Sequence, residues 1–376
     1  MTILSVLGAI WWIAGFVTFA ASLVGALVQP LIRRRTTTGA ALPPVSLIVP
    51  VKLVNPGFLR AQRSVFQQDY PGYEVLVGTA ETESPALAIM RELAGHSAIP
   101  NRIVHSPTTA AVSPKLNTLT APLETAAHDV VVTKDSNISF GPTTLRDLMR
   151  SFGPGVGMVC AVPVAVRPET LAGVIEAILI NRDARLLLTA SALGKGFGIG
   201  KVMLFRRSDL AKAGGIAAMS YTIAEDSALS KGFAAIGLKT VFSDRTVDQE
   251  IGARSLRDVY ARQARWAAIR RAEEPVSFPL EPLACPIPAA IAGALAAPLL
   301  GLGGIAGFGL TLGGWLVIEL VVTAVKRWEI SPWHPIAFLG RDLVLLGAWA
   351  AAWTTREVTW AGRKQDVRDV LRKPGA

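Results

Sequence analysis

The sequence predicts an α/β domain, with a mainly parallel sheet covered by helices on both faces, joined to α-helical transmembrane segments. Two observations predict it. Short apolar runs alternate with helical patterns between about residues 45 and 134, which is typical of parallel strands joined by crossover helices. Long apolar stretches flank this region, and 51% of the 376 residues are hydrophobic, with a mean hydropathy of +0.41. That balance is unusual for a wholly soluble enzyme.

The first expected element is a transmembrane helix over residues 3–32. It is long enough to cross a bilayer. It is also too long, and begins with too little positive charge, for a cleavable signal peptide. The cluster Arg33-Arg34-Arg35 follows at once. Because cytoplasmic flanks carry the excess of Lys and Arg, this cluster predicts a cytoplasmic location for the domain that follows.

Within the α/β region, strands are expected at residues 45–49, 73–77, 102–104 and 129–133, and helices at 56–66, 85–93 and 116–127. Ligands bind beyond the carboxyl ends of such strands. Glu81 and Asp135 each follow a predicted strand. We therefore expect both side chains to open onto one crevice.

The C-terminal third is apolar again. Residues 283–325 contain a Gly-rich break at 301–304 that suits a turn between two spans, and a further apolar stretch covers residues 336–353. Arg341 and Asp342 make that last stretch the candidate for a segment that does not span the membrane, so the number of spans stays open. We divide the chain into an N-terminal helix with its basic stop (1–35), the α/β domain (43–275), a hydrophobic membrane region (276–356) and a basic cytoplasmic tail (357–376).

The charge is formally +10, from 38 Lys and Arg against 28 Asp and Glu. This excess fits an anionic membrane surface or an anionic substrate. Basic stripes with interleaved aromatic residues are absent from the sequence, so we expect no nucleic-acid partner. The two cysteines, Cys160 and Cys285, lie in apolar contexts. They predict neither a disulfide framework nor a Cys-built zinc site, and they favour a reducing compartment.

Three further segments carry candidate chemistry. Asp135-Ser136-Asn137 can offer a carboxylate and an amide oxygen to Mg²⁺ or Mn²⁺, although the same residues also cap turns. Asp226, before a predicted helix at 227–233, is a candidate general base, or an acid favoured by the helix dipole. Upstream, glycine occupies every second position from 194 to 200, which lets a backbone approach a ligand closely.

Basic residues offer phosphate contacts. Arg262, Arg265 and Trp266 lie in a predicted basic helix over residues 256–271. Arginine suits bidentate phosphate binding, while the alternative is an amphipathic helix on anionic head groups with Trp266 at the interface. Lys115, at the start of a helix, can reach a phosphate or face solvent.

Together these segments resemble the motif series of ceramide glucosyltransferases, membrane enzymes of glycosyltransferase families 21 and 2 with a GT-A-type catalytic domain. The order of motifs and spans matches over nearly the whole chain. The segments that carry the resemblance are Ser113-Pro114-Lys115-Leu116-Asn117, Lys134-Asp135-Ser136-Asn137, Ala224-Glu225-Asp226, Arg262-x-x-Arg265-Trp266 and Trp360-x-Gly362-Arg363.

The resemblance implies roles by position. Glu81 would contact the nucleotide; the family usually has Asp there, and Glu83 is the alternative contact. Asp135 would hold the metal and the diphosphate, and Asp226 would be the catalytic base. The remaining substrate-binding residues would be Lys115, Arg262, Arg265 and Trp266. A second departure is Asp183, where animal members tend to have His.

The implied function is inverting transfer of a hexose, glucose from UDP-glucose, to a membrane lipid hydroxyl, with Mg²⁺ or Mn²⁺. Ceramide is the first acceptor by resemblance, which implies sphingolipid metabolism. Diacylglycerol and hopanoid-type acceptors are alternatives, as is a polysaccharide synthase of the cellulose or hyaluronan type. Arg262 replaces the Gln usual in those synthases, and the short C-terminal region favours a single transfer. The expected location is a cell membrane crossed several times, the bacterial inner membrane, with the catalytic domain in the cytoplasm.

Overall fold

The computed structural model describes residues 3–33, 42–360 and 363–368, and the chain folds into two compact units. We name one the sheet unit, which comprises Val28–Val166, Ala190–Gly252 and the segment from Arg368. The other is the helical unit, which comprises the chain up to Leu27, Arg167–Thr189 and Ala253–Val367. Of the sequence motifs, Arg34, Arg35 and Gly362 lie outside the described residues.

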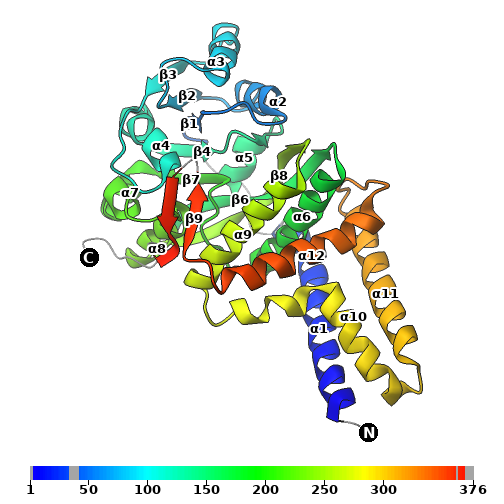
Figure 1. Cartoon of the computed structure of the whole chain (residues 1–376). Helices are drawn as coiled ribbons and strands as arrows, with labels where there is room; N and C mark the ends of the chain where they lie inside the picture. Colours follow the sequence, from blue (N-terminus) through cyan, green and yellow to red (C-terminus); the bar gives the residue numbers. More distant parts are fainter. Residues whose placement is uncertain (1–2, 34–41, 361–362, 369–376) are drawn as a thin grey trace. The chain divides into compact units, whose positions relative to one another are not determined.

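The sheet unit is built on an eight-stranded mixed sheet with the order β3-β2-β1-β4-β7-β6-β8-β5 (Figure 1). β1 runs parallel to β2 and β4, and β2 runs parallel to β3. β7 is antiparallel to both β4 and β6. The strands are β1 Val45–Pro50, β2 Tyr73–Thr79, β3 Asn101–His105, β4 Val130–Lys134, β5 Ile138–Ser139, β6 Val156–Pro168, β7 Val202–Arg206 and β8 Lys239–Gly252.

Helices cover both faces of the parallel half, as the alternating pattern predicted. Val45, Leu47 and Val49 of β1 pack into one core cluster with Phe58 and Leu145. On the opposite face, α4 contacts β1 and β2. Burial on both faces explains why these strands are continuous apolar runs. The helices are α2 Phe58–Arg63, α3 Pro85–Gly95, α4 Pro114–Thr125, α5 Thr144–Arg150, α7 Arg207–Lys212 and α8 Glu225–Ala235, with 3₁₀ turns η1 Ser64–Phe66 and η2 Ile216–Met219.

Two helix starts that border the candidate site follow from local sequence. Ser84 accepts a hydrogen bond from the Leu87 N–H at 3.1 Å, and α3 begins with proline. Ser113 likewise accepts from the Leu116 N–H at 3.4 Å, and α4 begins with Pro114. A serine cap followed by proline in the first turn favours helix initiation. The cap at Ser113 therefore fixes the position of Lys115 in the first turn of α4.

Among the described residues, the helical unit contains three helices that are long and apolar enough to cross a membrane, at residues 3–32, 304–325 and 334–352. A fourth is possible if the segments Phe278–Ala284 and Pro286–Leu300, bent by 71°, count as one span. The predicted membrane character is therefore confirmed. The unit's helices are α1 Ile3–Arg33, which continues into the sheet unit, α6 Leu171–Ala192, α9 Leu256–Glu273, α10 Pro286–Ala296, α11 Gly304–Val325 and α12 His334–Ala352; short 3₁₀ turns are η3 Phe278–Ala284 and η4 Ala297–Leu300, and β9 Glu357–Trp360 pairs with β10 Arg363–Asp366.

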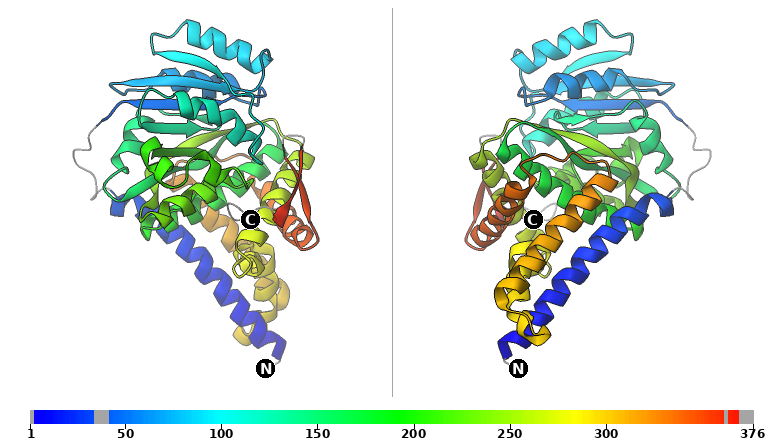
Figure 2. Two further views of the ribbon diagram at one scale, coloured as in Figure 1. Left: turned by 90° about the vertical axis from the view of Figure 1, so that its left-hand side faces the viewer. Right: turned by 90° about the vertical axis from the view of Figure 1, so that its right-hand side faces the viewer.

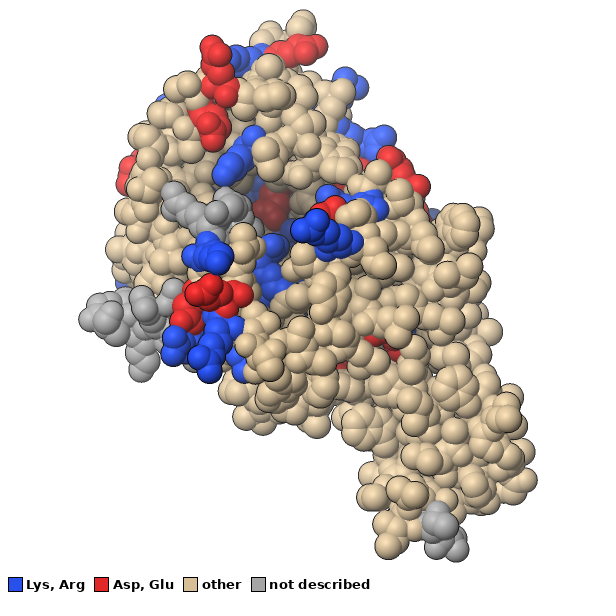
Figure 3. Space-filling model, viewed as in Figure 1, with Lys and Arg blue, Asp and Glu red and all other residues tan. Residues whose placement is uncertain are grey.

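α1 and α11 run side by side in both views of Figure 2. The ring of Phe19 stacks on Trp315 at a centroid distance of 4.0 Å, and Val322 joins the same cluster. The visible face of the projecting α1, α10 and α11 segments carries almost no charged side chains (Figure 3). Such a surface suits a lipid environment.

The charged pair of α12 faces protein. Arg341 and Asp342 are 1% and 0% exposed. Arg341 bonds to Glu319 of α11 at 2.9 Å and to Asp342 at 3.0 Å. Arg185 also pairs with Glu319 at 2.9 Å, so the four charges neutralise one another inside the unit and do not prevent α12 from crossing the membrane.

Candidate active site

Asp135 lies just beyond the carboxyl end of β4 and is held between two lysines. Its Oδ1 is 2.7 Å from the Lys115 ammonium, and its Oδ2 is 3.0 Å from that of Lys201. Lys115 comes from the first turn of α4, and Lys201 directly precedes β7, the antiparallel neighbour of β4. The carboxylate therefore forms ion pairs and does not cap its own turn. Sequence reasoning assigned no role to Lys201.

Hydrogen bonds to neighbouring segments hold the turn that follows β4. Buried Lys134 donates hydrogen bonds to the carbonyl oxygens of Ala61 and Ile138, at 3.0 and 2.6 Å. Gln62 donates to the Ser136 carbonyl oxygen at 2.6 Å. These contacts fix the backbone on both sides of Asp135, so its side chain is presented from a rigid base.

Glu225 and Asp226 begin α8, and both join the same cluster. Asp226 accepts hydrogen bonds from the Gly200 N–H at 2.6 Å and the Ser227 N–H at 2.8 Å. Glu225 accepts from the Ser113 hydroxyl at 3.0 Å and lies 3.6 Å from the Lys115 ammonium. Lys115 also donates to the Gly200 carbonyl oxygen. The structure thus unites Lys115, Asp135 and Asp226, three of the predicted site residues.

The glycine run packs against this cluster. A Cβ atom at Gly198 would overlap the carbonyl group of Asp226, and one at Gly200 would lie 3.1 Å from the Lys115 ammonium. Only glycine allows these approaches without a shift of the backbone or of the lysine. The glycine run therefore lies against the backbone of Asp226 and positions this candidate catalytic residue.

The charge states of the cluster follow from burial and pairing. Burial alone would raise the pKa of Asp135, but the two lysines outweigh it and hold the pKa at about 2. Burial lowers the pKa of Lys115, and the charges of Asp135 and Glu225 raise it above its ordinary value. Burial raises the pKa of Glu225 to about 7, Lys115 opposes that rise, and Asp226 adds to it. The cluster therefore keeps Asp135 ionised at pH 7 and places one carboxyl in the neutral range.

Glu81 follows β2 on an exposed turn. Its backbone N–H donates to the Thr79 hydroxyl at 3.0 Å, and Glu83 is exposed as well. β1 lies between β2 and β4 in the sheet, which separates the ends of β2 and β4 by about 10 Å. Glu81 thus shares the strand-end edge with Asp135 without contacting it.

Arg262, Arg265 and Trp266 lie on α9 of the helical unit. Arg262 forms an ion pair with buried Glu176 of α6, which Arg254 also contacts at 3.3 Å. Burial and the nearby charge of Arg262 lower the pKa of Arg265 to about 10. Within the described part of the chain, Arg265 contacts no carboxylate. Arg265 is therefore a half-buried cation, which suits an anionic ligand.

Asp135 is the one predicted metal ligand. Among the described residues, no group of three His, Cys, Asp or Glu side chains is arranged to hold a metal ion. A hard cation here would have one protein carboxylate and would take its other ligands from water and from a bound phosphate. Mg²⁺ commonly binds in this way.

Two curated ceramide glucosyltransferases are similar in sequence to this chain. The chain is 25% identical over 246 residues to ceramide glucosyltransferase 1 of Caenorhabditis elegans, covering 64% of this chain and 53% of that protein. It is 23% identical over 242 residues to the ceramide glucosyltransferase of Komagataella phaffii, covering 56% and 46%. The chain therefore spans about half the length of these curated relatives.

The fold is shared with a solved enzyme. A mannosyltransferase from Pyrobaculum calidifontis, in complex with GDP-mannose and Mn²⁺, superposes with a TM-score of 0.51 at 18% identity, covering 92% of this chain and 98% of that one. The predicted GT-A-type fold is confirmed. Residues 10–371 match the sequence profile of glycosyl transferase family 21, which confirms the predicted glycosyltransferase class and the resemblance to ceramide glucosyltransferases. The chain belongs to glycosyl transferase family 21.

Proposed function

We propose that this protein is an inverting hexosyltransferase that moves glucose from UDP-glucose to a hydroxyl group of a membrane lipid. Ceramide is the leading candidate for that lipid. This proposal rests mainly on one observation, the cluster of Lys115, Lys201, Asp135 and Asp226 at the strand ends. It combines cations for a diphosphate with a carboxylate for proton transfer. The curated relatives named ceramide glucosyltransferase support the sugar, the acceptor and a role in sphingolipid metabolism.

Asp226 is the proposed base. Two backbone N–H groups fix the position of its carboxylate. The acceptor hydroxyl would lose its proton to Asp226 as its oxygen bonds to the anomeric carbon. The bond from that carbon to the phosphate oxygen would break, and its electron pair would leave with the nucleoside diphosphate. One such displacement inverts the anomeric configuration.

Lys115, Lys201 and Asp135 are the proposed diphosphate site. The two ammonium groups can turn from Asp135 to phosphate oxygens, which would offset the charge of the leaving diphosphate. A bound Mg²⁺ or Mn²⁺ on Asp135 would supply Lewis-acid stabilisation of the same leaving group. The Mn²⁺ in the Pyrobaculum calidifontis enzyme supports this choice of metal, and the single ionised carboxylate suits it.

We also propose roles for the other predicted site residues. Glu81 would contact the nucleotide base, because a nucleotide lying across the strand ends must extend beyond β1. Arg265, which lacks an acidic partner among the described residues, would bind a phosphate, with Arg262 and Trp266 beside the acceptor. We also propose the domain order of N-terminal span (1–35), catalytic domain (43–275), membrane region (276–356) and basic tail (357–376).

We further propose that the catalytic domain faces the cytoplasm of a bacterial cell, where nucleotide sugars are made. The basic residues after the first span support this orientation. A reporter fused after Arg271 should behave as cytoplasmic. Periplasmic reporter activity at that position would contradict the orientation.

The test of the transfer reaction uses membranes that contain the full chain. Labelled UDP-glucose, UDP-galactose and GDP-mannose are each offered with ceramide, diacylglycerol or a hopanoid-type lipid, and the products are resolved by mass spectrometry. Glucosylceramide with inverted configuration is the expected product. Asp69→Asn, a change at an exposed residue, is the matched control for site variants. A polysaccharide product, or no lipid product with any pair, would contradict the proposal.

A further inference from the structure

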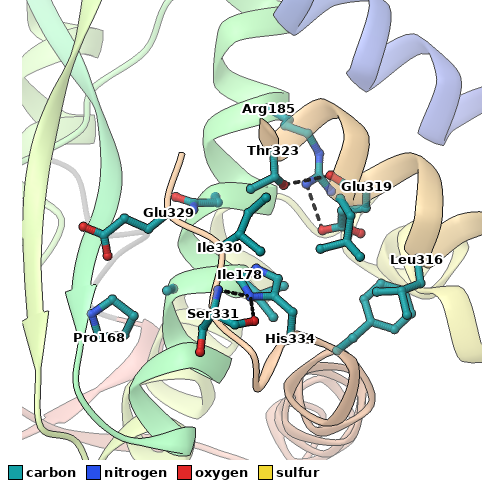
Figure 4. A pocket seen from close by; sticks show the side chains of 14 residues that line it. Pro168, Ile178, Arg185, Leu316, Glu319, Thr323, Glu329, Ile330, Ser331 and His334 are labelled. Atoms are coloured by element: carbon teal, nitrogen blue, oxygen red, sulfur yellow. Dashed lines mark hydrogen bonds and ion pairs between the residues drawn. The ribbon is translucent and has the colours of Figure 1, made fainter. Parts of the chain in front are cut away.

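The helical unit contains a cavity of about 170 Å³ that is lined by none of the proposed catalytic or substrate-binding residues. Its walls come from α6, from the second half of α11, from the start of α12 and from the segment that joins α11 to α12 (Figure 4). Pockets that enclose a whole drug-sized ligand measure about 300–1,000 Å³. This cavity therefore suits one end of a larger molecule.

The walls divide into an apolar and a polar part. Ile178, Leu316 and Phe338 are among the apolar side chains. The polar part contains side chains that can donate and accept hydrogen bonds, namely Asn181, Arg185, Glu319, Thr323, Ser331 and His334. A ligand that fits both parts has a polar head joined to a hydrocarbon body.

The charged side chains around the cavity give it no net positive charge. Glu319 accepts hydrogen bonds from Arg185 and Arg341, each at 2.9 Å, and Arg341 also contacts Asp342. Two guanidinium groups thus meet two carboxylates. Glu329 adds a further acidic side chain to the wall, whose carboxylate accepts a hydrogen bond from the Arg167 N–H at 2.6 Å. This balance disfavours a phosphate-bearing ligand and favours an uncharged polar one.

The polar wall also contains an unsatisfied donor. Arg185 is 3% exposed, and its Nε–H is buried without a hydrogen-bond partner. Buried donors are rarely left in this state. Arg185 lines the cavity, so a carbonyl or hydroxyl oxygen of a ligand held there would add a polar partner to the wall that contains this guanidinium.

The position along α11 indicates where the cavity meets the bilayer. Glu319 and Thr323 lie in the last two turns of α11, and Lys326 and Arg327 follow its end. Basic residues that flank a span mark the head-group region. Leu316 lies one turn deeper. The polar wall is thus on the head-group side and the apolar wall on the hydrocarbon side.

We propose that this cavity binds the uncharged, hydroxyl- or amide-bearing head of a membrane lipid, whose chains extend along the apolar wall into the bilayer. The inference rests on the proposed lipid transfer, since it gives the acceptor a site in the helical unit. It goes beyond that proposal by naming the side chains that select an uncharged head over a phosphate.

The test measures direct binding of fluorescent short-chain lipids to the full-length protein in detergent micelles. The lipids are ceramide, diacylglycerol and phosphatidic acid. Leu320→Trp fills the cavity, and Val321→Trp is the matched control, because Val321 is the next residue of α11, is 55% exposed and does not line the cavity. Leu316→Trp with Val317→Trp forms a second pair, and thermal unfolding confirms that each variant is folded.

Ceramide or diacylglycerol should bind wild type and both control variants equally, and each cavity-filling variant at least about tenfold more weakly. A tenfold change in Kd corresponds to about 1.4 kcal/mol of binding free energy. UDP-glucose binding, measured on the same samples, should not change. The inference is overturned if both filled variants bind the uncharged lipids like wild type, or if phosphatidic acid binds as tightly as they do. Normal lipid binding without any sugar transfer would instead count against the proposed function.

Discussion

Gly198→Ala tests whether the glycine run positions Asp226. A Cβ atom at residue 198 would overlap the carbonyl group of Asp226 and would lie 2.8 Å from the Ser227 nitrogen, although real Cβ atoms essentially never come within 3.0 Å. All three atoms are backbone atoms at the start of α8, so the chain itself must move. A displacement on the order of 1 Å at a reacting group reduces turnover about 10²-fold.

The same overlap destabilises the fold only moderately. Overpacking costs about 1–3 kcal/mol, which corresponds to a decrease of roughly 2–12 °C in the unfolding temperature for a unit of this size. Gly200→Ala should reduce transfer less, because its Cβ would contact the flexible ends of Lys115 and Asp226 at 3.1 and 3.2 Å. Gly153→Ala is the control, since a Cβ there meets nothing within 4 Å.

The assay compares initial rates of lipid glucosylation with unfolding temperatures for the three variants. The expected order of lost activity is Gly198→Ala, then Gly200→Ala, with Gly153→Ala unchanged. If folded Gly198→Ala kept activity within a few-fold of wild type, the argument that this contact positions Asp226 would be wrong.

Three further predictions concern charge. Because folding raises the pKa of Glu225 from 4.5 to about 7, its contribution to stability is full below pH 4.5 and is lost as the pH rises through 7. Glu225→Gln should flatten the dependence of the unfolding temperature over that window, and an unchanged slope would refute the assignment. Chelation with EDTA should abolish transfer and Mg²⁺ or Mn²⁺ should restore it, while Asp135→Ala should stay inactive in either metal; EDTA-resistant activity of that variant would remove Asp135 from the site. Glu319→Ala leaves two buried guanidinium groups without their shared partner and should cost about 3–5 kcal/mol, measured by thermal unfolding against the exposed Asp69→Asn; equal stabilities would contradict it.

Local sequence predicted the elements of the parallel half well. The helix expected at residues 116–127 is observed at Pro114–Thr125, and the strand expected at 129–133 at Val130–Lys134. Apolar runs and serine–proline helix starts are local signals, so they need no knowledge of the fold. The mixed character of the sheet was missed, because β7 pairs antiparallel to β4 across about seventy residues of sequence.

That same pairing explains the missed lysine. Lys201 reaches Asp135 because the residue after it, Val202, pairs with Lys134 across the two strands. No spacing in the sequence shows this. The only local signal was a basic residue between a glycine run and an apolar strand. Similarly, the ion pair between Arg341 of α12 and Glu319 of α11 became visible only in the fold.

The most direct test of the account is the behaviour of Asp226→Asn, with lipid glucosylation and UDP-glucose binding measured on the same purified sample. The amide is nearly isosteric but cannot take a proton from the acceptor hydroxyl, so transfer should decrease by about 10²–10⁴-fold. Donor binding should stay at the wild-type level, since the proposed diphosphate site consists of Lys115, Lys201 and Asp135. Transfer within a few-fold of wild type would show that Asp226 is not the base, and loss of donor binding would place it in the diphosphate site.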